Sequence, residues 1–268
     1  MDSIRQAVEL ARSGDNFPQQ ELVGASKPIS VGHEVSSIRE VRLNADHLEA
    51  NRIVAFGGGS ESGRYYDMLR TQVLQEMDKK NWQFLAITSP TAGCGKTVTA
   101  CNLAMSIARL PERSALVVDL DLRKPRVASY LGLPKSEGVL GVLEGRSPIS
   151  SAVVKASVGP NSLFVLPGAG LSSGSSEWMA SQTMTALLQG IKREFRSHTV
   201  IFDLPPMLLG DDVISIFPRM DATLLVTGVG SSSVADIKEC QKHLDRVPVV
   251  RVVVNKVTEK IDTYYGYY

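Results

Sequence analysis

Short, mainly apolar runs alternate along the chain with segments in which apolar residues recur at helical spacing. The runs are typical of strands buried on both faces, and they predict strands at 84–88, 115–118, 163–167, 199–203, 222–227 and 249–254. The spaced segments predict helices at 65–77, 96–109, 138–143, 177–195 and 234–244. This alternation predicts an α/β fold with a mostly parallel central sheet and helices on both faces.

The pattern also predicts how the chain is divided. Residues 1–60 are expected to be a poorly ordered N-terminal region with a candidate short helix over Ile4–Arg12, followed by a glycine-rich linker at 57–63. Residues 61–258 are the predicted main domain, and 259–268 a flexible tail. In the predicted helix at 65–77, an apolar face of Leu69, Val73 and Met77 is expected to pack on the core.

The other faces of that helix carry Tyr65, Tyr66, Asp67 and Arg70, which are predicted to be solvent surface rather than an oligomer contact. In the predicted helix at 234–244, the buried stripe is expected to consist of Val234, Ile237 and Leu244.

Composition excludes several classes of function. The net charge is +1 and the pI about 7.7, so no basic field favours nucleic acid. No apolar run reaches the roughly 18 to 20 residues of a membrane span, and no signal peptide is evident. The three cysteines lack metal-ligand spacing, as expected of a reducing compartment. We therefore expect a cytoplasmic protein, peripheral to the inner membrane only through a partner.

The segment after the first long apolar run predicts a phosphate-binding loop. A buried strand, a glycine-containing turn and a helix follow one another, which directs backbone N–H groups and a helix dipole at one point. The predicted nucleotide-binding residues of this segment are Thr91, Ala92, Gly93, Cys94, Gly95, Lys96, Thr97 and Val98. Lys96 would contact the β- and γ-phosphates of ATP, and Thr97 would bind Mg²⁺. The strict Walker A pattern fails because Pro90 occupies its first glycine position, but a merely structural turn leaves the Lys-Thr pair unexplained.

Three aspartates end predicted parallel strands and should meet at one edge of the sheet. Asp119 and Asp203 are the predicted metal residues with Thr97, and Asp203 fits a Walker B position. Asp121 is the candidate to orient an acceptor hydroxyl or take its proton, which makes Lys96, Asp119, Asp121 and Asp203 the predicted catalytic set. Two more predicted nucleotide-binding residues are Arg123, which would offset phosphate charge, and Asn255, which either contacts the base or caps its strand.

The sequence ends in a cluster of tyrosines. Tyr264, Tyr265, Tyr267 and Tyr268 make up four of the seven tyrosines of the chain. The cluster is interpreted either as phosphoacceptors or as an aromatic end that docks on a partner.

Taken together, these features resemble the bacterial tyrosine kinases (BY-kinases) of the polysaccharide-biosynthesis autokinase type, in a cytoplasmic stand-alone form, from about residue 64 onward. The matching segments are 89–97, Val118–Pro125, Gly138–Leu143, Phe202–Pro206 and the terminal tyrosines. The resemblance implies a P-loop kinase domain that phosphorylates its own tyrosines in trans with ATP and Mg²⁺. It also implies assembly into a ring and a membrane-embedded polysaccharide co-polymerase, or chain-length regulator, as activator of exopolysaccharide or capsule export.

One position departs from the family pattern. The oligomer helix of the family reads Glu-x-x-Arg-x-x-Arg, whereas Arg64, Asp67 and Arg70 stand here, so only the last residue matches. Two alternatives to the kinase remain open. One is a non-kinase ATPase switch of the partitioning or division-site type that binds a membrane partner, and the other is a weakly catalytic regulatory subunit whose tail docks on a membrane protein.

Overall fold

The computed structural model describes residues 38–168, 170, 174–245 and 247–258 of the 268-residue chain. The candidate helix at Ile4–Arg12 and the tyrosines at 264–268 lie outside these residues. Within them, no helix is long and apolar enough to cross a membrane.

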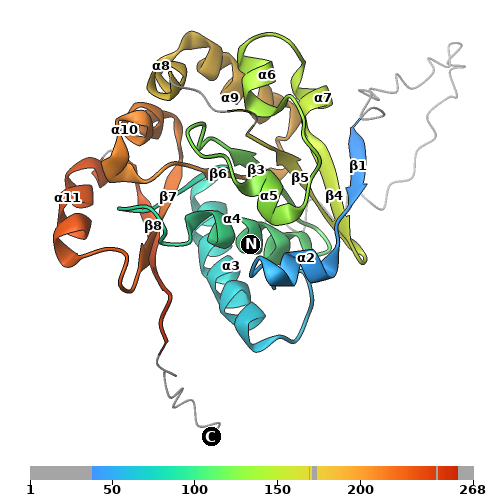
Figure 1. Ribbon diagram of the computed structural model, residues 1–268, viewed down its shortest axis with the longest axis horizontal. Coiled ribbons are helices and arrows are strands. Elements are labelled where there is room, and N and C mark those ends of the chain that lie inside the picture. The colour runs from blue at the N-terminus through green and yellow to red at the C-terminus, as the bar shows by residue number, and fades with distance from the viewer. Residues whose placement is uncertain (1–37, 169, 171–173, 246, 259–268) are drawn as a thin grey trace, which may run out of the picture. The chain divides into compact units, whose positions relative to one another are not determined.

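An eight-stranded sheet forms the centre of the domain, in the order β1-β4-β5-β3-β6-β2-β7-β8 (Figure 1). All neighbouring strands are parallel except the β4–β5 pair, which confirms the predicted mostly parallel sheet. The strands are β1 (Arg39–Arg42), β2 (Phe84–Thr88), β3 (Ser114–Asp119), β4 (Val154–Val158), β5 (Asn161–Leu166), β6 (His198–Asp203), β7 (Ala222–Gly228) and β8 (Val249–Asn255).

Helices cover both faces of this sheet because successive strand residues point to opposite sides. In β2, Phe84 and Ala86 belong to one core cluster, and Leu85 and Ile87 belong to the other. The Leu85 side packs against α2 (Ala45–Ala50), α3 (Glu61–Lys80), α4 (Lys96–Ala108) and α5 (Val127–Leu131). The Phe84 side packs against α6 (Gly138–Leu143), α7 (Ile149–Ala152), α8 (Ser175–Ala180), α9 (Gln182–Glu194), α10 (Asp212–Ile216) and α11 (Val234–Leu244). Short 3₁₀ turns at Met207–Leu209 and Phe217–Arg219 complete the fold.

The domain begins earlier than residue 61, where the sequence pattern placed its start. β1 pairs in parallel with β4, and Leu48, Ile53 and Ala55 are buried in the core. The pattern missed β1 because it is an edge strand whose arginines and glutamate are mostly exposed, so it has no apolar run. The predicted linker is also shorter, since Ser60 caps α3 by accepting a hydrogen bond from the Gly63 amide.

Two helices differ from their predicted form. The helix predicted at 177–195 is two helices, because the hydroxyl of Ser181 accepts a hydrogen bond from the Met184 amide and starts α9 there. The bounds of α11 are as predicted, but Val234 is 70% exposed and Cys240 is buried in its place.

The strand β8 forms one edge of the sheet. Val229 N–H donates to the Asn255 carbonyl and the Thr227 hydroxyl donates to the Val253 carbonyl, so these two carbonyls face β7. The alternate residues Val252 and Val254 turn their backbone groups to the edge with which no strand of the described residues pairs. Their side chains are 52% and 61% exposed.

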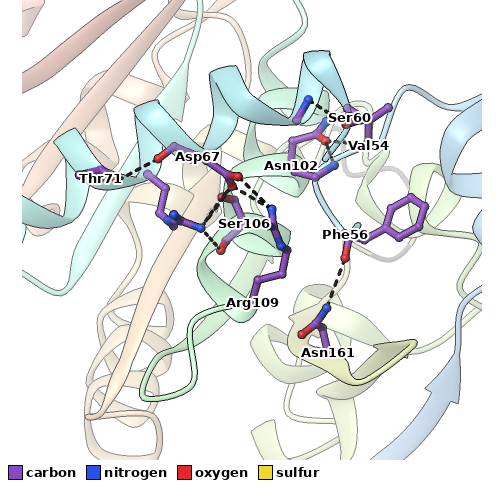
Figure 2. A network of polar contacts seen from close by, with 12 residues as sticks. Val54, Phe56, Ser60, Asp67, Thr71, Asn102, Ser106, Arg109 and Asn161 are labelled. Atoms are coloured by element: carbon purple, nitrogen blue, oxygen red, sulfur yellow. Dashed lines mark hydrogen bonds and ion pairs between the residues drawn. The ribbon is translucent and has the colours of Figure 1, made fainter. Parts of the chain in front are cut away.

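An ion network joins α3 to α4 (Figure 2). The Asp67 carboxylate accepts from the guanidinium groups of Arg70 at 3.2 Å and Arg109 at 2.9 Å, and from the Ser106 hydroxyl at 2.5 Å. Arg70 also donates to the Ser106 carbonyl at 2.9 Å. The prediction of a solvent face was therefore wrong for Asp67 and Arg70, which hold α3 on α4, and for Tyr66, which is partly buried against the core. Tyr65 is 58% exposed, as expected.

Asn102, one turn before Ser106 on the same face of α4, joins this helix to the segment before α3 (Figure 2). It is fully buried, and its carboxamide oxygen accepts the N–H groups of Val54 and Ala55 at 2.7 and 3.0 Å. Its nitrogen donates to the carbonyls of Arg52 and Val98, both at 2.9 Å. A single side chain thus satisfies four backbone groups and sets the position of α4.

We expect Asn102→Ala to lower the free energy of unfolding by about 2 to 4 kcal/mol, because several buried backbone groups lose their partner. Asn161→Ala is the matched control, since Asn161 makes one long bond, at 3.3 Å to the Phe56 carbonyl, and should cost under about 1 kcal/mol. Urea denaturation of both variants measures the difference. Equal losses would contradict the role assigned to Asn102.

Candidate nucleotide site

The predicted phosphate loop joins β2 to α4. Gly93 and Gly95 have φ of 80° and 95°, in the left-handed region that favours glycine. Gly95 is the N-cap of α4, and among the described residues no side chain caps this end of the helix. The N–H groups of the first turn are therefore available to a ligand, and the helix dipole favours an anion there.

Lys96, the first residue of α4, lies between two of the predicted carboxylates. Its ammonium is 2.9 Å from an oxygen of Asp121 and 3.2 Å from an oxygen of Asp203. Burial alone would lower the pKa of Lys96, but the charges of Asp203 and Asp121 outweigh it and raise the pKa. Lys96 is therefore held as a cation in a site where it is only 9% exposed.

Strand register brings the aspartates together. Asp203 pairs with Ile87 of β2 on one side and with Asp119 of β3 on the other. The Thr97 hydroxyl donates to Asp203 at 2.6 Å, so a hydroxyl and a carboxylate stand side by side where the sequence predicted a metal. Burial raises the pKa of Asp203, opposed by the neighbouring Lys96 ammonium.

Asp119 lies at this edge but supports the backbone of the turn after β3. One oxygen accepts the N–H groups of Arg126 and Val127, both at 3.0 Å, and the other accepts that of Asp121 at 3.2 Å. Burial and the charge of Asp203 raise the pKa of Asp119 to about 8. By positioning the turn, Asp119 places Asp121 against Lys96.

Arg123 contacts residues outside this cluster, and its predicted role against phosphate charge stays a prediction. Its guanidinium is 2.8 Å from the buried Asp212 carboxylate and donates to the Ser175 hydroxyl at 2.8 Å. Because Asp212 begins α10 and Ser175 begins α8, Arg123 joins these two helices to the turn after β3.

Asn255 contacts the phosphate loop itself. Its carboxamide nitrogen donates to the Cys94 carbonyl at 2.9 Å. The sequence reasoning missed one further loop contact, in which the Thr91 hydroxyl donates to the Ser231 carbonyl at 2.5 Å, and a supporting bond outside the loop, in which Lys256 donates to the Ser231 hydroxyl at 3.1 Å. Neither Ser231 nor Lys256 belongs to a motif, so only the fold reveals them.

Within the described residues, no three His, Cys, Asp or Glu side chains are grouped to hold a metal ion by themselves. A magnesium ion here would take ligands from the phosphates and water as well as from Thr97 and Asp203, which is usual for Mg²⁺. The predicted phosphoacceptors at 264–268 lie outside the described residues.

The fold and this loop define a P-loop nucleotide-binding protein. The profile of the CobQ/CobB/MinD/ParA nucleotide binding domain matches residues 85–265. The chain therefore belongs to that family, and its curated relatives place it with the bacterial tyrosine kinases. The resemblance stated from the sequence is thereby confirmed.

Among those relatives, the tyrosine-protein kinase CpsD of Streptococcus pneumoniae is 26% identical over 209 residues, which cover 76% of this chain and 89% of CpsD. EpsB of Ralstonia nicotianae, which carries a tyrosine-protein kinase name, is 31% identical over 200 residues. That match covers 74% of this chain but only 26% of the length of EpsB.

Solved structures agree on the fold. The chimerical protein CapA2B2 is 22% identical with a TM-score of 0.70, covering 83% of this chain and 94% of the other. Cobyrinic acid a,c-diamide synthase from Mycobacterium smegmatis, solved with ADP and magnesium, is 20% identical with a TM-score of 0.51 over 63% of this chain and 73% of the synthase. These likenesses show the fold alone.

We expect Gly95→Ala to weaken ATP binding at least ten-fold. A Cβ at this position would lie 2.2 Å from the Asn255 nitrogen, so the loop would have to move. Gly159→Ala is the control: its φ of 55° imposes strain of about 1 kcal/mol or more, but a Cβ there meets open space. Equilibrium titration with ATP and Mg²⁺ measures both, and unchanged affinity in Gly95→Ala would refute the contact.

Proposed function

We propose that the chain is an ATP- and Mg²⁺-dependent protein-tyrosine kinase that phosphorylates its own C-terminal tyrosines, Tyr264, Tyr265, Tyr267 and Tyr268, in a second copy of the chain. The observation that carries the proposal is the buried cluster of Lys96, Asp121 and Asp203 at the mouth of the phosphate loop. The kinase relatives support the choice of acceptor, since phosphotransfer to tyrosine is what the name of CpsD states.

The cluster suits transfer of a phosphoryl group. Lys96 is a fixed cation at the first turn of α4, and the loop amides beside it can bind the oxygens of the transferred group. ATP binding would replace some of the contacts that Lys96 makes with Asp121, which releases that carboxylate for the acceptor.

Asp121 is the best placed of the three carboxylates to meet a tyrosine hydroxyl. Asp119 and Asp203 are fully buried and committed to backbone amides and to Thr97, whereas Asp121 is 5% exposed. A phenol with a pKa of about 10 is protonated at neutral pH, so a carboxylate that accepts its proton assists the attack on the γ-phosphorus.

The residues present fit a magnesium ion. The Thr97 hydroxyl and the Asp203 carboxylate are oxygen donors 2.6 Å apart beside the phosphate loop. When bound, the ion would neutralise charge on the phosphates. Asp119, the third predicted metal residue, would act through the turn that it supports.

Self-association and membrane partnership belong to the same proposal. In α3, Arg64 stands at the acid of the family pattern, and Asp67 stands at its first arginine and is bound to Arg70 and Arg109 in its own chain. A contact between copies through α3 would therefore rely on Tyr65 and Met68, which are 58% and 56% exposed. We infer that the protein is cytoplasmic and is held at the inner membrane by a polysaccharide co-polymerase. There it would regulate the chain length and the export of the polysaccharide.

Incubation of the full chain with γ-labelled ATP and Mg²⁺, followed by peptide mapping, tests the assignment. We expect label in the peptide that contains residues 264–268, and its loss in Lys96→Met. The variant with phenylalanine at 264, 265, 267 and 268 is the matched control, because it should still bind ATP while losing the label.

Label absent from that peptide, even with a co-polymerase supplied, would overturn the kinase. Steady release of phosphate to water without phosphotyrosine would instead favour the ATPase switch, which the family shared with MinD and ParA makes the second candidate.

A further inference from the structure

Asn255, the last residue of β8, binds the backbone of the phosphate loop. Asn255 is held at three points: its carbonyl accepts Val229 N–H at 3.0 Å, its carboxamide oxygen accepts Lys256 N–H at 2.8 Å, and its carboxamide nitrogen donates to the Cys94 carbonyl at 2.9 Å. Because the oxygen is used by a backbone donor, the nitrogen must be the atom that faces Cys94.

This contact acts on the peptide between Cys94 and Gly95. In a planar trans peptide the C=O and N–H bonds point in opposite directions. By drawing the Cys94 carbonyl outward to β8, Asn255 turns the Gly95 N–H inward, to the side of the loop where the N-terminus of α4 favours an anion.

The packing around this bond leaves the peptide little freedom. A Cβ on Gly95 would lie 2.2 Å from the Asn255 nitrogen, and a Cβ on Gly228 would lie 3.1 Å from the Cys94 Cα. Thr91 is tied to the Ser231 carbonyl, and Lys256 donates to the Ser231 hydroxyl. Two segments, the turn after β7 and the end of β8, thus pack against the phosphate loop.

We propose that Asn255 is a positioning residue that directs the Gly95 N–H at the phosphate chain, and that it does not read the base. The inference rests on the proposed function only in taking ATP as the ligand. It decides between the two roles that the sequence left open for this residue, because a side chain with its oxygen and one N–H engaged by the protein backbone acts on the loop.

The test compares three ligands on the full-length chain: MgATP, MgGTP and inorganic tripolyphosphate with Mg²⁺. In Asn255→Ala the affinity for all three should fall by about the same factor, about five- to ten-fold, as expected for one lost hydrogen bond. Asn255→Asp keeps the acceptor for the Lys256 N–H but places a carboxylate oxygen against the Cys94 carbonyl oxygen. The affinity should therefore fall by at least as large a factor as in Asn255→Ala.

Asn161→Ala is the matched control, because it removes an amide that also donates to a backbone carbonyl but lies at the start of β5, at the opposite end of a strand parallel to β3. Its affinities should equal those of the parent. Thermal unfolding without nucleotide separates a loop effect from loss of fold, since Asn255→Ala should melt close to Asn161→Ala.

Parent-like affinity in both Asn255 variants would overturn the inference. A loss confined to ATP, with tripolyphosphate binding unchanged, would overturn it in favour of a base contact. Failure of the parent chain to bind MgATP would refute the proposed function, and the inference with it.

Discussion

The site depends on one buried cation shared between carboxylates. Lys96 lies within 3.2 Å of oxygens of Asp121 and Asp203, with Asp119 in register beside Asp203. Removing such charges from water is costly, and the pairing offsets that cost only while the geometry is maintained. The ends of β2, β3 and β6 and the first turn of α4 therefore have to stay in register for the cluster to be stable.

The fold maintains that geometry by holding α4 and its loop from several sides. Asn102 binds the helix to residues 52–55, and Asp67 binds it to α3. Asn255 reaches the loop from β8. Residues 52–55, α3 and β8 lie in separate parts of the sequence, so a short motif in the chain is positioned by segments outside it.

Apolar periodicity predicted six of the eight strands, because strands buried on both faces give continuous apolar runs with polar residues at their ends. The same rule placed Lys96, Thr97 and the three aspartates at one edge. The strand β4 was missed because its buried residues alternate with Lys155 and Ser157 instead of forming a continuous apolar run. The edge strand β1 was missed because its residues are charged and mostly exposed. The break between α8 and α9 was missed because a serine within a helical pattern is recognised as an N-cap only when its hydroxyl is seen to accept a backbone N–H, as that of Ser181 does from Met184.

Side-chain direction was the part that sequence could not supply. Arg123 follows the carboxylate pair in the chain, yet it turns to Asp212, an acid encountered about ninety residues later. Asp67 likewise lies on a helix face that periodicity assigned to solvent, but Arg109 of the neighbouring helix neutralises it. Both outcomes depend on partners that only the tertiary structure brings near.

The two edge strands of the sheet, β1 and β8, differ in the side chains that they expose. Charged residues line β1, a common protection against unwanted pairing, whereas β8 presents Val252 and Val254 beside backbone groups that face outward. An unprotected apolar edge of this kind is where sheets of separate molecules join. Where two copies of the described domain pair through their sheet edges, β8 is therefore favoured over β1 as the strand that pairs.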